Sequence, residues 1–309
     1  MGSRINMTNR IEIAETSFHN GLLTYYGYEE LDDAFIDEIV KNPVIRYIQI
    51  SRQLPAEAYV RIDNILAKRP DMYFRIYGLY QEKTFDLSRL HCMKHLKKLI
   101  LDFSMKDRHD LCDLGVLCEI GDLRTLSLNL FDLRDYRFLK ELPENMKELA
   151  ISADTMNGSV AFDCNWLLRY EKLARLYLGK KAKKNLQAIA QLPQLKKLTL
   201  RGIKTNDLAF LRERQLLAFA LHWCGMNDLG SLRNFTSLRE LELWRIMKLE
   251  DISFISTLTG LEKLSLVDLN HIHELPDLTE LKSLREIRLD NVPIDPEKVP
   301  EQYREMIHR

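Results

Sequence analysis

A short apolar phrase, L-x-x-L-x-L, recurs along most of this 309-residue chain. If the fourth position of each copy is taken as a marker, successive copies lie 23–27 residues apart in the N-terminal half and 21–23 apart in the C-terminal half. A fixed period of this size is typical of a solenoid, in which each repeat contacts only its neighbours. The markers are Ile48, Phe74, Leu99, Leu126, Leu149, Leu176, Leu198, Phe219, Leu241, Leu264 and Ile287.

One copy of the phrase has the alternation of a β-strand. Its first, fourth and sixth positions point inward, and its third, fifth and seventh positions point outward. A single repeat cannot cover its own leucines, each of which contributes about 1.5–3 kcal/mol when buried. The repeats must therefore stack, with their strands pairing in parallel about 4.8 Å apart. The longer N-terminal repeats leave room for true helices between strands, whereas the shorter ones leave room only for short helical or 3₁₀ segments.

The phrase resembles that of the leucine-rich repeat family over roughly residues 45–292, and the C-terminal half looks most like the 22-residue class of bacterial internalins and a phosphatase-regulating subunit. The segments 207–211, 228–232 and 251–255 are similar to that class's turn onto its convex side. The resemblance implies an α/β solenoid: a curved horseshoe with a parallel concave sheet and a helical or 3₁₀ convex side.

The sequence departs from the family at the ninth position of the repeat. Asparagine is usual there and bonds its side chain to the backbone; cysteine is a known kind of substitute, whereas isoleucine and leucine lead us to expect a distorted turn. The residues present are Ile203, Cys224, Ile246 and Leu269.

We expect three parts along the chain. Residues 1–44 form an N-terminal cap with an irregular first repeat and a helix over 29–42. Residues 45–292 hold about eleven repeats, with a second helix over about 56–68 that buries Val60 among others. Residues 293–309 form a C-terminal capping helix. Residues 1–6 have the appearance of a remnant, with Met7 as a candidate natural start.

The composition favours a cytoplasmic protein. The first residues carry no apolar signal-peptide core, and no run approaches the length of a membrane span. The five cysteines include no C-x-x-C pair, which favours reduced thiols. Lys+Arg and Asp+Glu both number 45, and this balance argues against a dedicated nucleic-acid binder.

No catalytic motif is present, and we predict no enzyme activity, no cofactor and no metal site. A phosphate loop, G-x-S-x-G and H-E-x-x-H are all missing from the sequence. His91 with His95, and His271 with His273, have ligand-like spacing but no companion ligands, so solvated surface is favoured. The basic run Lys180–Lys184 keeps nucleic-acid binding open as an alternative. A secreted or surface adhesion protein of internalin type is the other alternative.

The outward strand positions carry the candidate binding residues. Tryptophan, tyrosine and arginine gather around Ala218 and Ala220, whose small side chains leave a dip, and this composition is typical of a protein-binding hot spot. Trp223, at the eighth position, could instead turn inward and fill the core. The candidates are Tyr177, Arg201, His222, Trp223, Glu240, Glu242, Trp244, Arg245 and Arg288, and a weaker upstream patch holds Tyr47, Arg52, Tyr73, Arg75 and Tyr77.

These features predict a non-enzymatic protein–protein interaction scaffold that binds a partner protein on its concave face. Side chains fixed in advance by strands lose little entropy on binding. The roles of inhibitor, adaptor and immunity-type regulator all stay open.

Overall fold

The computed structural model describes residues 9–20, 23–78, 85–106, 112–205, 207–212, 214–295, 297 and 299–308. The chain divides into two compact units, Met1–Ala161 (unit 1) and Phe162–Arg309 (unit 2). The expected remnant 1–6, Met7, Leu22 and Pro296 lie outside the described residues.

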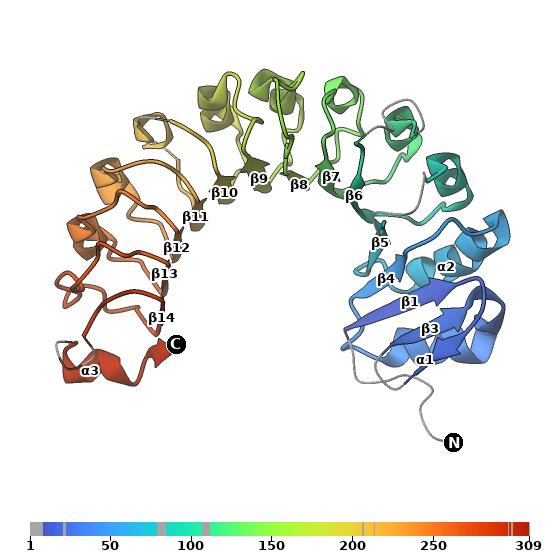
Figure 1. Ribbon diagram of the computed structural model, residues 1–309, viewed down its shortest axis with the longest axis horizontal. Helices are drawn as coiled ribbons and strands as arrows, with labels where there is room; N and C mark the ends of the chain where they lie inside the picture. Colours follow the sequence, from blue (N-terminus) through green and yellow to red (C-terminus); the bar gives the residue numbers. More distant parts are fainter. Residues whose placement is uncertain are drawn as a thin grey trace. The chain divides into compact units, whose positions relative to one another are not determined.

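Unit 1 is an open solenoid with its strands in one sheet (Figure 1). The strand order is β8-β7-β6-β5-β4-β1-β3-β2, and the pairs are parallel except β2 with β3. Its elements are β1 (Arg10–Ala14), β2 (Phe18–His19), β3 (Thr24–Gly27), the 3₁₀ helix η1 (Tyr28–Glu30), α1 (Asp33–Lys41), β4 (Tyr47–Ile50), α2 (Ala56–Lys68), β5 (Tyr73–Tyr77), η2 (Leu87–Cys92), β6 (Lys98–Ser104), η3 (Leu114–Glu119), β7 (Thr125–Phe131), η4 (Arg137–Lys140) and β8 (Glu148–Ile151).

The two α-helices of unit 1 follow their local signals. Helix α2 has the bounds predicted for it, but Val60 is 47% exposed, so its predicted burial is wrong; Ile62 fills the core on that helix instead. Helix α1 begins at Asp33 rather than 29 because Asp32 caps it, accepting the Phe35 N–H at 2.7 Å.

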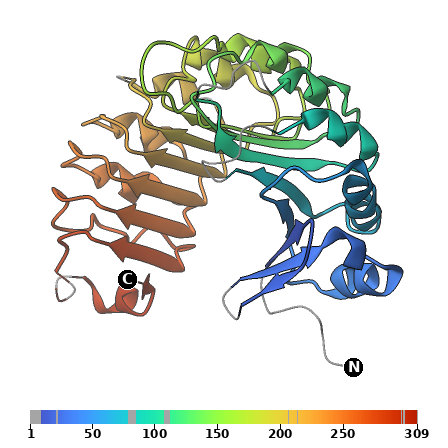
Figure 2. The same ribbon diagram turned by 45° about the vertical axis from the view of Figure 1, so that its right-hand side comes forward.

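Unit 2 is also an open solenoid, and its strands β9 to β15 follow chain order and pair in parallel. Figure 2 shows the strands of unit 2 side by side in one layer, with the 3₁₀ segments behind them. The elements are η5 (Cys164–Arg169), β9 (Arg175–Gly179), η6 (Leu186–Gln191), β10 (Lys197–Arg201), η7 (Ala209–Leu211), β11 (Ala218–His222), η8 (Gly230–Asn234), β12 (Glu240–Trp244), η9 (Ser253–Thr257), β13 (Lys263–Val267), β14 (Glu286–Asp290), α3 (Glu301–Arg304) and β15 (Ile307–His308).

The core of unit 2 consists of ladders of apolar side chains, one rung per repeat. Leu198, Phe219 and Leu241 lie opposite one another in register and are at most 2% exposed. The sixth positions form a second ladder that includes Leu221 and Leu243, both fully buried. The predicted inward positions and the solenoid are therefore confirmed.

Aspartate starts the outer side of many repeats. In the three segments singled out from the sequence, the Oδ1 atoms of Asp207, Asp228 and Asp251 accept backbone N–H groups two residues on, at 2.7–2.8 Å. A 3₁₀ helix follows each turn. Asp86 and Asp113 accept backbone N–H groups in the same way in unit 1. True helices were expected in the longer repeats. In the described residues a true helix is found after β4, but none is found after β5, β6 or β7.

The residue after each strand from β9 to β14 takes a left-handed conformation. The φ angles are +63° at Gly202, +58° at Trp223, +54° at Arg245 and +53° at Asp268. Each of these N–H groups donates to the carbonyl that ends the next strand, at 2.7–2.9 Å. The ninth residues, including the isoleucines and the leucine expected to distort the turn, are at most 3% exposed. The turn is regular instead. Backbone N–H groups form the hydrogen-bond ladder between repeats, and the apolar side chain of the ninth residue enters the core.

The C-terminal cap is shorter than the helix predicted over 293–309. Helix α3 spans four residues, and β15 then adds to the edge of the sheet in parallel with β14. Val299 and Tyr303, 1% and 7% exposed, cover the last repeat. Proline at 300 limits the helix on its N-terminal side.

Candidate functional site

The strand face of unit 2, defined as the outward side chains of β9 to β14, has three rows. The strand registers bring most of the predicted residues onto this single face. The third-position row is Arg175, Lys197, Ala218, Glu240, Lys263 and Glu286; the fifth-position row is Tyr177, Thr199, Ala220, Glu242, Ser265 and Arg288; the seventh-position row is Gly179, Arg201, His222, Trp244, Val267 and Asp290.

A recess of about 360 Å³ opens on this face. Ala218 and Ala220 line it, as the dip expected from their small side chains requires. Charged side chains on the neighbouring strands, including Glu242 and Arg288, form much of the rest of its lining. Tyr177, predicted to stand at the rim, does not line it.

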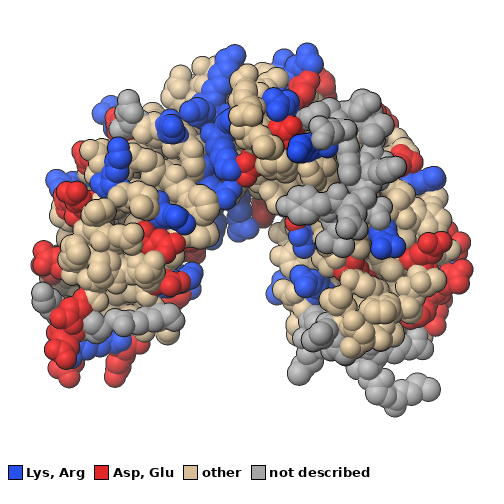
Figure 3. Space-filling view, viewed as in Figure 1, with Lys and Arg blue, Asp and Glu red and all other residues tan. Residues whose placement is uncertain are grey.

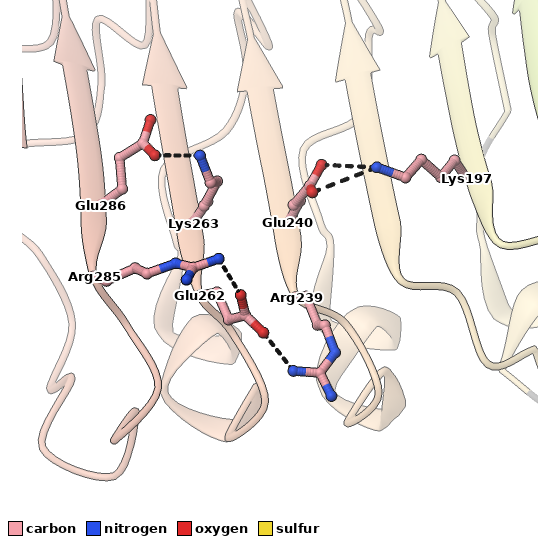
Figure 4. A network of polar contacts seen from close by, with 7 residues as sticks. All are labelled: Lys197, Arg239, Glu240, Glu262, Lys263, Arg285 and Glu286. Carbon is pink, nitrogen blue, oxygen red and sulfur yellow. Dashed lines mark hydrogen bonds and ion pairs between the residues drawn. The ribbon is translucent and has the colours of Figure 1, made fainter.

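The third-position charges beside the recess neutralise one another. Lys197 Nζ reaches over Ala218 on β11 to Glu240 Oε2 on β12, at 3.4 Å, and Lys263 pairs with Glu286 (Figure 4). One row below, Glu262 accepts from both Arg239 and Arg285 (Figure 4). Exposed pairs such as these contribute about 0–1 kcal/mol each to stability, so they order the surface more than they hold the fold.

Trp223 is the centre of an exposed aromatic–cation cluster. Its ring lies 4.9 Å from the Arg201 guanidinium carbon and 5.2 Å from that of Arg245. Trp244 meets it edge to face at 6.0 Å. Trp223 is 43% exposed, so the alternative that it fills the core is wrong. The left-handed backbone at Trp223 accounts for this, because it turns the side chain outward while Cys224 enters the core.

His222 and Glu242 lie between the recess and this cluster. The His222 ring packs against Trp244 at 5.3 Å. Its Nε2 lies 3.2 Å from Glu242 Oε1, an ion-pair distance, although the alignment falls short of a hydrogen bond. This contact lowers the pKa of Glu242 more than partial burial raises it.

Asp268 and Asn291 complete the cluster and escaped the sequence-based prediction. Trp244 Nε1 donates to Asp268 Oδ2 at 2.9 Å, and Asn291 Nδ2 donates to Asp268 Oδ1 at 2.7 Å. The bonds from Asn291 and Trp244 lower the pKa of Asp268. Both residues occupy the eighth position, as Trp223 and Arg245 do, so the spacing could have found them.

The upstream patch in unit 1 belongs to an internal network. Tyr77 donates to Glu12 Oε2 at 2.6 Å, and its pKa is raised by burial and by that bond. Glu12, only 8% exposed, also accepts from Gln49 at 3.1 Å and Ser51 at 2.6 Å. Sequence reasoning missed Glu12, although the I-E-I alternation of β1 places it outward.

The other patch residues divide between packing and solvent. Tyr47 stacks on Tyr73 at 5.2 Å, and Arg75 lies 4.9 Å over the Tyr77 ring while pairing with Asp102. Arg52 is exposed after β4. Most of this patch is therefore committed to neighbours within unit 1.

The histidine pairs do not converge on a metal. His95 Nδ1 lies 2.9 Å from Asp63, whereas His91 Nε2 lies 3.2 Å from Glu119. His271 and His273 are exposed. Within the ranges that the structure describes, no three His, Cys, Asp or Glu side chains gather as ligands would. Within those same ranges, no helix is long and apolar enough to cross a membrane.

The basic run lies at the end of β9. Lys184 Nζ is 3.5 Å from Asp163 Oδ2, so part of its charge is compensated. On the face shown in Figure 3, Lys and Arg side chains gather in a band over the repeats of β9 and β10. Acidic side chains are more frequent over the repeats nearer the C-terminus (Figure 3).

Comparisons with known proteins find similarity in solved structures alone. No family model and no curated protein matches the chain. Internalin C2 of Listeria monocytogenes is 21% identical, with a TM-score of 0.45 over 59% of this chain and 76% of that one. An internalin, inlF, of the same organism is 17% identical, with a TM-score of 0.47 over 84% and 78%. A chain of the Toll–Spatzle complex of Drosophila is 12% identical, with a TM-score of 0.45 over 80% and 40%.

Similarities this distant say nothing about a ligand, and assignment to the 22-residue class stays a prediction. The architecture rests on the chain itself: the recurring phrase, the parallel registers and the buried ladders. By these features the chain is an open solenoid whose repeats resemble leucine-rich repeats.

Proposed function

We propose that this chain is a non-enzymatic interaction scaffold that binds another protein on the strand face of unit 2. The observation that carries the proposal is the exposed cluster of Trp223, Arg201 and Arg245, which belongs to the same sheet as the recess over Ala218 and Ala220. Tryptophan and arginine are among the residues that contribute most to protein–protein affinity.

The backbone under this face supports tight binding. Each strand from β10 to β14 is paired with a neighbour on both sides, and β9 is paired with β10, all in fixed register. The side chains of the face therefore start from a rigid base, and little ordering entropy is lost when a partner docks. The existing ion pairs, such as Lys197 with Glu240, hold long side chains in place before binding.

The chemistry of the recess favours a protein over a small molecule. Its volume falls within the range of small-molecule sites, but those sites are lined mostly by apolar and aromatic groups. Here charged side chains of both signs line a shallow opening. Mixed charges on an open face suit the polar surface of another protein. An inhibitor, an adaptor or an immunity-type regulator could each use such a face.

Filling the recess tests the proposal. In Ala220→Phe a large side chain would stand in the opening, and we expect loss of a stoichiometric protein captured by the wild-type chain from lysate of its source organism. Ala150→Phe is the matched control, because Ala150 holds the same fifth position on β8 in unit 1. Capture would be read by mass spectrometry. A partner retained equally by both variants would place binding elsewhere, and capture of nucleic acid alone would overturn the proposal.

A further inference from the structure

Most charges on the strand face of unit 2 have a partner on that face. Lys197 pairs with Glu240, Lys263 with Glu286, and Arg288 donates to Asp290 at 2.8 Å. Arg201 and Arg245 differ: among the described residues, neither has a carboxylate within ion-pair distance. Two cations at this edge of the sheet therefore have no ion pair.

Both cations lie over the Trp223 ring, and among the described residues neither guanidinium donates a hydrogen bond. Each guanidinium carbon lies about 5 Å from the same ring, so the two groups are within roughly 10 Å of each other. A guanidinium that contacts a ring through its face keeps its in-plane N–H donors, which match the two oxygens of a carboxylate. Arg245 is exposed and Arg201 half-buried, so solvent-facing donors remain.

The nearest acid does not supply the missing anion. Asp268 follows β13 next to Arg245, but its two oxygens already accept from Trp244 and Asn291. The charge of Asp268 acts on Arg245, but no ion pair joins the two side chains. A carboxylate from another molecule would displace no existing ion pair at Arg201 or Arg245.

Positive charge continues along the same edge toward β9. Lys180 occupies the eighth position one repeat before Gly202, and its Cγ would lie 3.3 Å from a Cβ added at Gly202. Its stem thus lies against the turn that follows Arg201. Lys204 is exposed just beyond that turn. A bound chain with several acidic residues could follow this edge from β9 to β12, because neighbouring strands are about 4.8 Å apart.

An acidic protein segment fits this cluster better than a nucleic acid does. Single-stranded nucleic acids bind by stacking bases on open aromatic faces. The Trp223 ring is already contacted by two guanidinium groups and, edge to face, by Trp244. The groups that remain able to bind a ligand at the cluster are guanidinium N–H donors rather than an open aromatic ring.

We propose that the Arg201–Trp223–Arg245 cluster receives an acidic segment of the partner protein, with Asp or Glu carboxylates bound by the two guanidinium groups. The inference rests on the proposed function and adds the chemical class of the partner surface. The recess over Ala220 takes the adjoining part of that partner.

Defined peptides test this. Fluorescence anisotropy at low ionic strength would compare labelled hexaglutamate, hexalysine and hexathymidylate on the full chain. We expect hexaglutamate to bind at least about tenfold more tightly than hexalysine, the change that one bidentate pair is worth. Arg201→Gln with Arg245→Gln should remove that preference.

Two further variants separate a local contact from net charge and from misfolding. Arg239→Gln with Arg285→Gln removes the same charge from unit 2 at guanidinium groups already paired with Glu262, and it should leave hexaglutamate affinity within about twofold. Arg201→Glu with Arg245→Glu should bind hexalysine more tightly than the wild-type chain does, a gain that unfolding cannot produce.

Three results would overturn the acidic-segment proposal: equal affinity for hexaglutamate and hexalysine, an equal loss in both glutamine double variants, or tighter binding of hexathymidylate that the Arg201 and Arg245 variants abolish. The proposed function has its own test. A protein captured by the wild-type chain and lost in Ala220→Phe would keep the protein-binding function even if the peptides showed no preference.

Discussion

The left-handed turn after β10 can be tested by substituting its glycine, a change that adds only a methyl group. Gly202 has φ of +63°, and its N–H donates to the His222 carbonyl at 2.7 Å. An alanine held in this conformation costs about 1–2 kcal/mol. Alanine also leaves the unfolded chain fewer conformations than glycine does, and this offsets about 0.4–1 kcal/mol of the cost. The new Cβ would meet Lys180 Cγ at 3.3 Å, and that flexible stem can move. We expect Gly202→Ala to lower the free energy of unfolding of unit 2 by roughly 0.5–1.5 kcal/mol.

Gly225→Ala is the matched control. Gly225 is two residues beyond Trp223, its φ is outside the left-handed region, and an added Cβ would have no heavy atom within 4 Å. Its alanine variant should be neutral or stabilised by up to about 1 kcal/mol. Gly202→Asn should lose less than Gly202→Ala, because asparagine tolerates the left-handed region.

Tryptophan fluorescence during urea unfolding is a suitable assay. The three tryptophans, Trp166, Trp223 and Trp244, all belong to unit 2, so the signal reports that unit. The shift of the urea midpoint at constant slope gives the change in stability. If Gly202→Ala were as stable as Gly225→Ala, the left-handed turn would not be the constraint we infer.

Two further predictions concern titration and thiol reactivity. His222 holds the folded-state pKa of Glu242 below its ordinary value of 4.5, so the stability this carboxylate contributes is complete above that pH and is lost as the pH falls through the lower folded value. Glu242→Gln should therefore flatten the loss of unit 2 stability on acidification below about pH 4.5, and an unchanged urea–pH profile would contradict the contact. Burial raises the pKa of Cys112 and Cys164 to about 12. Neither thiol should react with dithiobis-nitrobenzoate at about pH 8 until denaturant is added; labelling of either in the native protein, located by mass spectrometry, would show that it is accessible.

The strands were predictable because two independent signals agree on them. Alternation fixes which side of β12 Leu241 and Leu243 occupy, and the repeat spacing fixes which residues of β11 and β13 lie opposite them. Burial of both leucines requires the same register in every repeat. The rows of the strand face, including Ala218 and Ala220, follow from that register with no further information.

The direction of Trp223 was not predictable, because it depends on a backbone angle. A positive φ at a residue other than glycine is uncommon, and tryptophan gives no hint of it. The glycine one repeat earlier, Gly202, was the available clue. The Asp268 and Glu12 networks were missed for another reason: their partners come from strands distant in sequence, and which side chains bond depends on rotamers as well as register.

The helices expected in the longer repeats of unit 1 were overpredicted because spacing was taken as a measure of helix length. Helix α2 forms because its apolar residues recur with helical period over its whole length. After β5 and β6 an aspartate turn starts a six-residue 3₁₀ helix instead.

The pair formed by Lys197 and Glu240 means that the two sides of the sheet would respond differently to the exchange of one repeat. Beneath the strands each rung touches only the next, so one repeat could be duplicated or exchanged while its neighbours keep their packing. Above them, Lys197 reaches past β11 to β12, which it can do because Ala218 leaves clearance. A change in one repeat thereby alters the electrostatic surroundings of the next but one. Exchanging one repeat would therefore preserve the packing beneath the sheet but could remove a charge that a repeat two strands away needs.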